Sequence, residues 1–118
     1  MNAEELKKRT KLFALEVINL VESLPKTKTT NVISNQLIRS GTSVGANYRA
    51  ACRAKSKADF INKLKIVEEE DEESIYWMEL LEDAKVVESS KLTHIKKEAD
   101  ELLSIFVSSI KKAKGIRD

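Results

Sequence analysis

The chain has 118 residues, of which 34% are charged and only 5% aromatic, with one proline and three glycines. This balance favours a helical bundle and argues against a sheet protein or a disordered chain. We expect one domain spanning residues 1–118. No apolar run is long enough to cross a membrane, the charged start has no signal-peptide core, and a single cysteine fits a reducing compartment. The expected location is therefore the cytoplasm, without membrane contact.

The first predicted helix spans about residues 3–24. Asn2 precedes it and Glu5 follows three positions later, which is the spacing of an N-terminal capping box. Pro25 and the polar residues behind it are expected to end the helix. The apolar side chains recur at helical spacing and predict one buried stripe, formed by Leu6, Phe13, Val17, Leu20 and Leu24.

The second predicted helix spans about residues 31–54, with Thr30 as its expected cap. Small residues lie beside its apolar stripe and include Gly41 and Gly45, each of which costs about 1 kcal/mol relative to alanine inside a helix. Their presence indicates close packing against another helix, or a bend. The single cysteine, Cys52, is expected to be a small core residue rather than a reactive thiol.

The third predicted helix spans about residues 57–85 and begins with a capping box formed by Ser56 and Asp59. Residues 68–74 of this helix carry six carboxylates and no apolar side chain. Because successive helical residues turn by about 100°, some of these acids must face the core. An isolated carboxylate there either takes up a proton or meets a cation, and we expect a cation or a wet interface at this height.

The fourth predicted helix spans about residues 90–114, opened by Ser89 or Ser90, with Gly115 beyond its end. The three connections between these predicted helices are short. Neighbouring helices should therefore be antiparallel, and the expected fold is all-α, an up-down-up-down four-helix bundle.

A polar set is predicted near the middle of the bundle. Its functional interpretation is a buried network or a binding slot between helices; the structural interpretation is an ion-pair layer that fixes the helix register. The members of this predicted polar core are Arg39, Asn47, Glu70, Asp71 and Glu73.

A basic cluster is predicted around the turn between the second and third helices. Residues 49–65 hold six basic residues against one acid, whereas residues 68–83 hold nine acids and no base. The cluster can bind nucleic-acid phosphates, but it can also serve solubility or face the acidic band of another subunit. The basic tail, Lys111, Lys112, Lys114 and Arg117, can add to either role. The candidate nucleic-acid-binding residues are Arg49, Arg53, Lys55, Lys57, Lys63 and Lys65.

No catalytic arrangement is visible in the sequence, and we expect no enzymatic activity, no cofactor and no metal. Helical di-metal sites need Glu-x-x-His motifs, yet the only histidine is His94, an expected surface residue with Lys91 three positions before it. Phosphate loops and dinucleotide fingerprints are absent. Tyr76 and Trp77 could stack on bases if exposed, but Trp77 is expected to be buried in the core or in a subunit interface.

Several segments of the chain together carry a resemblance to known proteins. They are Gln36–Arg39, Ser43–Arg49, Ser56–Phe60, Lys63–Val67 and Ile75–Leu81, together with Glu70 and Glu73. These segments resemble a bacterial family called four-helix bundle proteins, or ribosomal RNA intervening-sequence proteins. The resemblance implies a left-handed antiparallel bundle that commonly assembles as a ring of five. It also implies kinship with nucleic-acid-binding accessory proteins of diversity-generating retroelements, which partner a reverse transcriptase.

The sequence and this resemblance lead to one functional expectation and one alternative. The expectation is a non-enzymatic homo-oligomer, a pentamer by resemblance, that binds RNA or DNA through its basic face or recruits a reverse transcriptase or another nucleic-acid enzyme. The alternative is a structural or protein-interaction adaptor whose charges serve self-assembly. Charge segregated along the chain suits head-to-tail contact between copies, which closes into a ring when the geometry permits.

Overall fold

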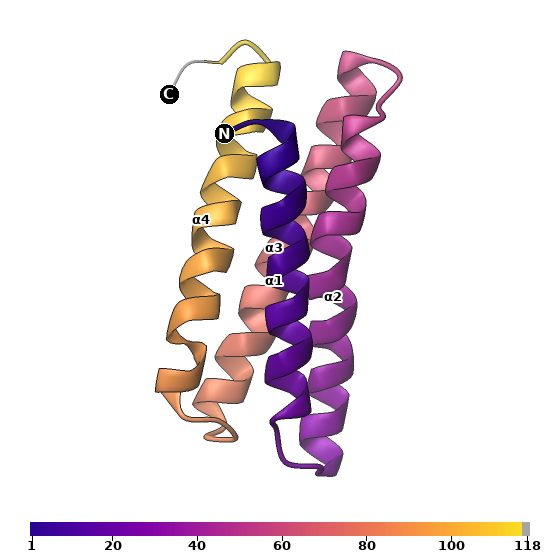
Figure 1. Ribbon diagram of the computed structural model, residues 1–118. Helices are drawn as coiled ribbons and strands as arrows, with labels where there is room; N and C mark the ends of the chain where they lie inside the picture. Colours follow the sequence, from indigo (N-terminus) through magenta and orange to yellow (C-terminus); the bar gives the residue numbers. More distant parts are fainter. Residues whose placement is uncertain (117–118) are drawn as a thin grey trace.

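The computed structural model describes residues 1–116, and its regular structure within them is entirely helical. Successive helices run in opposite directions and form an antiparallel bundle of about 45 × 25 × 20 Å (Figure 1). This arrangement confirms the predicted all-α four-helix fold. The four helices are α1 (Ala3–Glu22), α2 (Lys28–Cys52), α3 (Lys57–Asp83) and α4 (Ser89–Ala113).

Two helix starts are those predicted from the sequence. The Asn2 side chain accepts a hydrogen bond from the Glu5 backbone N–H at 2.9 Å, and α1 begins directly after it. The Ser56 hydroxyl accepts from the Asp59 backbone N–H at 3.1 Å at the start of α3. Each cap satisfies a backbone donor that has no partner within the helix, so both boundaries are fixed by local chemistry.

The capping residues of the other two helices differ from those predicted. Helix α2 begins at Lys28, because Thr27 and not Thr30 provides the cap: the Thr27 hydroxyl accepts from the Thr30 N–H at 3.2 Å. Thr30 is instead buried in the first turn. Helix α4 begins at Ser89 behind Glu88, whose side chain makes no capping bond. Neither serine is the cap that the sequence suggested.

Helix α3 ends at Asp83, two residues earlier than predicted. Lys85 follows it with a left-handed backbone (φ 59°), and the Val86 N–H bonds back to the Leu81 carbonyl at 3.1 Å. This is the Schellman arrangement, in which glycine usually occupies the left-handed position. Gly115 takes that position after α4 (φ 79°), as predicted.

The core lies along the axis of the bundle and receives side chains from all four helices. Each helix packs against two others. Helix α1 lies beside α2 and α4, and α3 lies beside the same two helices on their other side. The largest fully buried side chains include Phe13, Leu37, Leu64, Met78 and Phe106. The apolar stripes predicted from the sequence thus form one continuous core.

Close packing, not a bend, accounts for the two glycines of α2. A Cβ atom at Gly41 would lie 2.9 Å from Cγ2 of Val17, and one at Gly45 would lie 3.1 Å from Oγ1 of Thr10. Both neighbours belong to α1, so the glycines let α1 approach α2 closely. Cys52, in contrast, is exposed and not a core residue, because it is the final residue of α2, just beyond the buried Ala51.

Each helix within residues 1–116 is too polar or too short to span a membrane.

Candidate nucleic-acid interface

The turn between α2 and α3 holds the first four residues of the predicted basic cluster. Arg49 lies in the last turn of α2, Arg53 is its C-cap residue, Lys55 lies in the turn, and Lys57 is the first residue of α3. All four side chains belong to exposed residues. The tight connection, fixed by the Ser56 cap, therefore keeps these cations together at one end of the bundle.

Asp59 partly neutralises this cluster. Its carboxylate accepts from the Lys63 ammonium at 2.6 Å and from the Lys55 backbone N–H at 3.1 Å. The hydrogen bond from Lys63, followed by that from Lys55, lowers the pKa of Asp59. Of the two remaining predicted members, Lys63 is thus half-buried and paired, whereas Lys65 is exposed.

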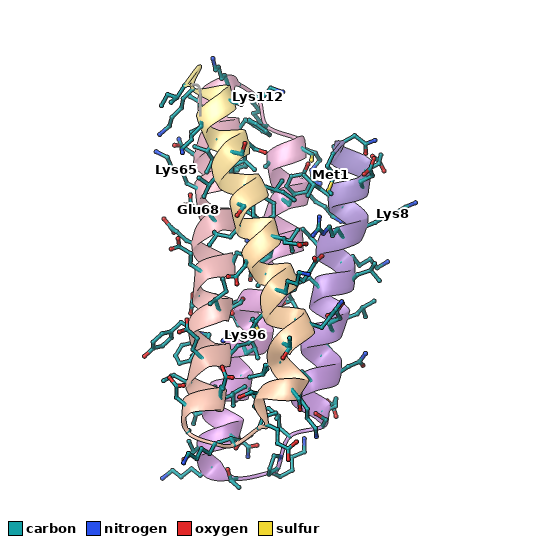
Figure 2. All side chains as sticks on the ribbon, turned by 90° about the vertical axis from the view of Figure 1, so that its left-hand side faces the viewer. Met1, Lys8, Lys65, Glu68, Lys96 and Lys112 are labelled. Atoms are coloured by element: carbon teal, nitrogen blue, oxygen red, sulfur yellow. The ribbon has the colours of Figure 1, made fainter. Side chains whose placement is uncertain are left out.

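The fold brings further cations to this end from parts of the chain that are distant in sequence. Because the helices alternate in direction, the start of α1, the end of α4 and the α2–α3 turn all lie at the same end of the bundle (Figure 1). Lys112 and Lys65 lie near this end in Figure 2. We call this end, with the exposed residues Lys8, Arg49, Arg53, Lys55, Lys57, Lys65, Lys112 and Lys114, the basic end. Arg117, predicted to add to it, lies outside the described residues.

Part of this positive charge also has a local structural use. Arg49 lies in the last turn of α2, and Lys111 and Lys112 lie in the last turn of α4. The carbonyl groups at a helix C-terminus carry partial negative charge, and cations there are stabilising by about 0.3–1 kcal/mol. Lys55 lies in the turn and Lys57 opens α3, where the helix N-terminus gives a cation no such stabilisation, so these two are the stronger candidates for an external anion.

The predicted polar core divides into separate parts. The first is an ion-pair network between α2 and α3: the Arg39 guanidinium donates to Glu70 at 3.1 Å and also to Glu73, whose carboxylate accepts from the Trp77 indole N–H at 3.2 Å. Arg39, followed by Trp77, lowers the pKa of Glu73. The Arg39 side chain is 48% exposed, so this network lies on the outside of the bundle and not in a buried layer.

The second part is Asp71, which is fully buried and lies apart from that network. Neither carboxylate oxygen has a hydrogen-bond partner among the described residues. Burial, together with the carboxylates of Asp100, Glu72 and Glu98, raises the pKa of Asp71 to about 8. The expectation that a cation meets the acids of α3 is therefore wrong for Asp71, which instead holds a proton at neutral pH.

Asn47 does not join either part. Its side-chain amide donates to the carbonyl of Ser43 one turn earlier at 2.8 Å, within α2. A buried contact between α2 and α3 lies two turns away on α2, where the Ser74 hydroxyl donates to the Ser40 hydroxyl at 2.8 Å. Two hydroxyls, and not the Asn47 amide, thus connect these helices.

One ion-pair cluster was not predicted from the sequence. Arg9 on α1 forms a two-pronged contact with Glu98 on α4, with both N–O distances 2.7 Å, and reaches Glu101 at 2.5 Å. The hydrogen bond to Glu98 contributes most to the raised pKa of Arg9. The partners are far apart in the sequence, and no spacing rule connects them before the topology is known. Similarly, Lys96 of α4 contacts Glu82 of α3 at 3.0 Å.

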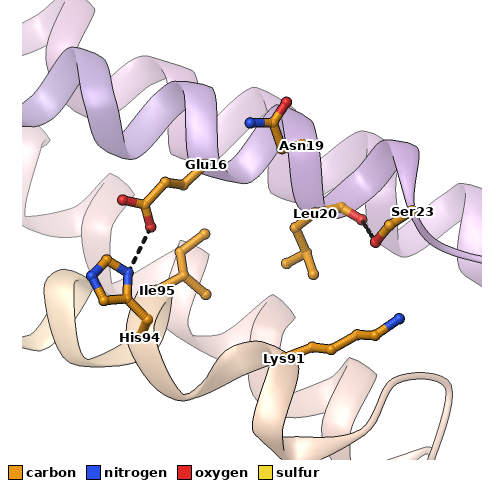
Figure 3. Close-up of a pocket in the computed structure, with 7 residues that line it drawn as sticks. All are labelled: Glu16, Asn19, Leu20, Ser23, Lys91, His94 and Ile95. Carbon is orange, nitrogen blue, oxygen red and sulfur yellow. Dashed lines mark hydrogen bonds and ion pairs between the residues drawn. The ribbon is translucent and has the colours of Figure 1, made fainter.

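A shallow groove lies between the second half of α1 and the start of α4 (Figure 3). These parts of the helices lie away from the basic end (Figure 1). The groove has a volume of about 340 Å³. His94 contacts the Glu16 carboxylate across it at 3.1 Å, and its side chain is 83% exposed, as predicted for a surface histidine. Among residues 1–116, no cluster of three or more histidine, cysteine or acidic side chains could hold a metal ion.

Tyr76 and Trp77, two of the three aromatic residues of α3, lie away from the basic end. Tyr76 is 54% exposed and contacts the edge of the half-buried Trp77, with ring centroids 5.1 Å apart. Tyr76 lies further along α3 than Lys65, by about 16 Å at the helical rise of about 1.5 Å per residue. Neither Tyr76 nor Trp77 therefore offers a stacking platform beside the basic cluster, and Phe60, in the first turn of α3, packs against the core.

These features define a four-helix-bundle protein with an exposed basic end and an acidic third helix. A family model described as "23S rRNA-intervening sequence protein" matches residues 4–108, which is nearly the whole chain. The chain therefore belongs to the 23S rRNA-intervening sequence protein family, as its motifs predicted.

A solved structure supports the same assignment. It is a protein of unknown function from the S23 ribosomal protein family of Bacteroides thetaiotaomicron, 38% identical in sequence, with a TM-score of 0.87. The similarity covers 94% of this chain and 99% of that one. No curated protein matches the chain.

Proposed function

We propose that this protein binds nucleic acid without catalysing a reaction, through phosphate contacts at its basic end, as a subunit of a ring-shaped homo-oligomer in the cytoplasm. The observation that carries the proposal is the convergence of exposed cations from α1, the α2–α3 turn and α4 on one end of the bundle. Sequence-independent nucleic-acid binding rests on such phosphate contacts.

Assembly would strengthen a weak patch. In a ring of five, which the family resemblance implies, every subunit presents its basic end on the same face. Linked binding sites raise the overall affinity by avidity without any tight single site. The name of the family refers to ribosomal RNA intervening sequences, and an RNA ligand is consistent with that name. Recruitment of a nucleic-acid enzyme, such as a reverse transcriptase, would use the same face.

A salt series tests phosphate contact directly. We expect binding of RNA and of duplex DNA to weaken steeply between about 50 and 200 mM salt, because each contact releases counterions. Reversing the charge of Arg53 and Lys55, both to glutamate, should abolish binding. The matched control reverses Lys26 and Lys28, which are exposed at the opposite end of the bundle, and should bind like the wild type.

The competing function is a structural adaptor whose charges serve contacts between subunits. The exposed leucines on the outside of α1 favour it, because such side chains suit a protein interface. The absence of detectable binding at about 50 mM salt, with the oligomer intact by native mass spectrometry, would contradict nucleic-acid binding and support the adaptor.

A further inference from the structure

Helix α1 exposes apolar side chains on the face that points away from the core. Leu12 is 58% exposed, Leu15 47% and Ile18 37%. They recur every three residues and so follow one side of the helix, opposite the buried Phe13 and Val17. We call this surface, with the neighbouring Lys8 and Lys11, the α1 outer face.

Helix α3 has a comparable surface. Ile66 is 43% exposed and Tyr76 54%. Between them, on the same side of the helix, lie the exposed carboxylates Glu69 and Glu72. We call this surface, with the adjoining Glu68, the α3 outer face. It combines apolar and acidic side chains, whereas the α1 outer face combines apolar and basic ones, so the two are complementary in charge.

The two faces point in opposite directions within one molecule. Both α1 and α3 pack against α2 and α4, and among the described residues they make no helix-to-helix contact with each other, so they are diagonal in the bundle. Figure 2 shows the consequence: Lys8 projects from one side of the molecule and Glu68 from the other. One chain cannot bring its two outer faces together, but a second copy can.

The register of the two helices favours this contact. Both helices run away from the basic end, and Lys8 and Glu68 lie at the same height along the bundle (Figure 2). At an equal rise per residue, Lys11 then lies level with the Glu72 region and Leu15 with Tyr76. Parallel copies placed side by side would therefore match basic residues with acidic ones and apolar residues with apolar ones.

The last turns are less well matched. Glu22 of α1 lies level with Asp83 of α3, and both are exposed acids. Like charges that face each other oppose association. The contact should therefore be centred on the first four turns of α1, where the lysines and leucines lie.

We infer that the α1 outer face of one copy packs against the α3 outer face of the next, with the two bundles parallel. This rests on the proposed self-assembly and names the surface that forms it. A contact between two different faces is heterologous, and successive copies close into a ring when the rotation between them permits. Every basic end would then lie on the same side of the assembly.

The first test substitutes Leu15 with glutamate and measures the native mass. The substitution lies outside the core, so the helical circular dichroism should be unchanged, but it places a carboxylate against the acidic α3 outer face. We expect the oligomer to dissociate to the single-chain mass of 13.3 kDa. The matched control is Val32→Glu, since Val32 is 58% exposed on α2, outside both faces; it should leave the oligomer intact.

Charge reversal makes the test directional. Lys8→Glu with Lys11→Glu should weaken the oligomer, and adding Glu69→Lys with Glu72→Lys in the same chain should restore it. Cross-linking then locates the contact: in a Cys52→Ser background, Leu15→Cys chains mixed with Tyr76→Cys chains should form disulfide-linked heterodimers. Neither chain alone should cross-link efficiently, because the two positions meet only across unlike faces.

The outcomes separate this inference from the broader proposal. A wild-type chain that stays monomeric would overturn both self-assembly and this interface, and would assign the exposed leucines to a different partner. An oligomer that survives Leu15→Glu and yields no mixed cross-link would overturn the interface alone. Binding of RNA or DNA is read separately through the Arg53 and Lys55 variant, so its failure does not affect this result.

Discussion

Replacing Asp71 with asparagine tests whether a carboxyl group in the core controls the stability of the bundle. Asp71 is fully buried, and neither of its oxygens has a partner among the described residues. Burial first, and then Asp100, Glu72 and Glu98, raise its pKa from the ordinary 3.8 to about 8. Asparagine has nearly the same shape but cannot ionise, so the substitution removes the titration and little else.

The sign of the effect follows from proton binding. Between about pH 4 and pH 8 the unfolded chain has lost the Asp71 proton while the folded chain keeps it. The folded state therefore binds the extra proton, and the free energy of unfolding falls as the pH rises through this window. Each pH unit is equivalent to about 1.36 kcal/mol. The fold should lose about 2.5 kcal/mol from this group between pH 5 and pH 7, and about 5.5 kcal/mol over the whole window.

Denaturant unfolding at pH 5, 6, 7 and 8 measures this loss. We expect Asp71→Asn to gain stability relative to the wild type by about 2.5 kcal/mol as the pH changes from 5 to 7. Ser74→Ala is the control, since Ser74 is buried on the same helix but carries no titratable group. A stability difference between Asp71→Asn and the wild type that stays constant over this range would refute the argument that the buried group is protonated.

Two further substitutions test surface features. Arg39→Ala should lower the free energy of unfolding by about 1 kcal/mol, because it breaks the half-exposed pairs with Glu70 and Glu73. The control is Lys97→Ala at an exposed position, which should change the free energy of unfolding by less than about 0.5 kcal/mol. Equal losses for the two variants in urea denaturation would contradict a role for the Arg39 network. Lys85→Gly should raise the melting temperature, since glycine avoids the cost of about 1 kcal/mol for a left-handed backbone. Lys85→Ala should not raise it. A higher melting temperature for Lys85→Ala than for Lys85→Gly would exclude this explanation.

Helix starts were predictable where a capping residue is followed by an acidic residue three positions later. Asn2 and Ser56 are such residues, and both cap the predicted helix. The start of α2 was not predictable to the residue, because residues 27–30 offer several threonines, and only the folded chain shows that Thr27 caps while Thr30 turns inward. At the end of α3, Lys85 takes the position of a glycine, so the usual sequence signal is missing.

The candidate site was predictable only in its local part. The cations of residues 49–57 are neighbours in sequence, and the turn keeps them together. The contribution of Lys112 depends on topology, since α4 returns to the same end. The spacing of the acids on α3 also showed that Asp71 had to face the core, but whether it met a cation depended on α4, which presents the acids Asp100 and Glu98 there and not a base. Arg9 was missed for the same reason, because its partners lie on that distant helix.

The position of the two described ends, residues 1 and 116, has a practical consequence. Both lie at the basic end of the bundle. An affinity tag fused to either would project over the cations that we propose bind phosphate, and a polyhistidine tag would add binding of its own. A circularly permuted chain that opens between α1 and α2, near Pro25, would move a tag to the opposite pole. Such a permutant would leave the proposed ligand surface unobstructed for measurement.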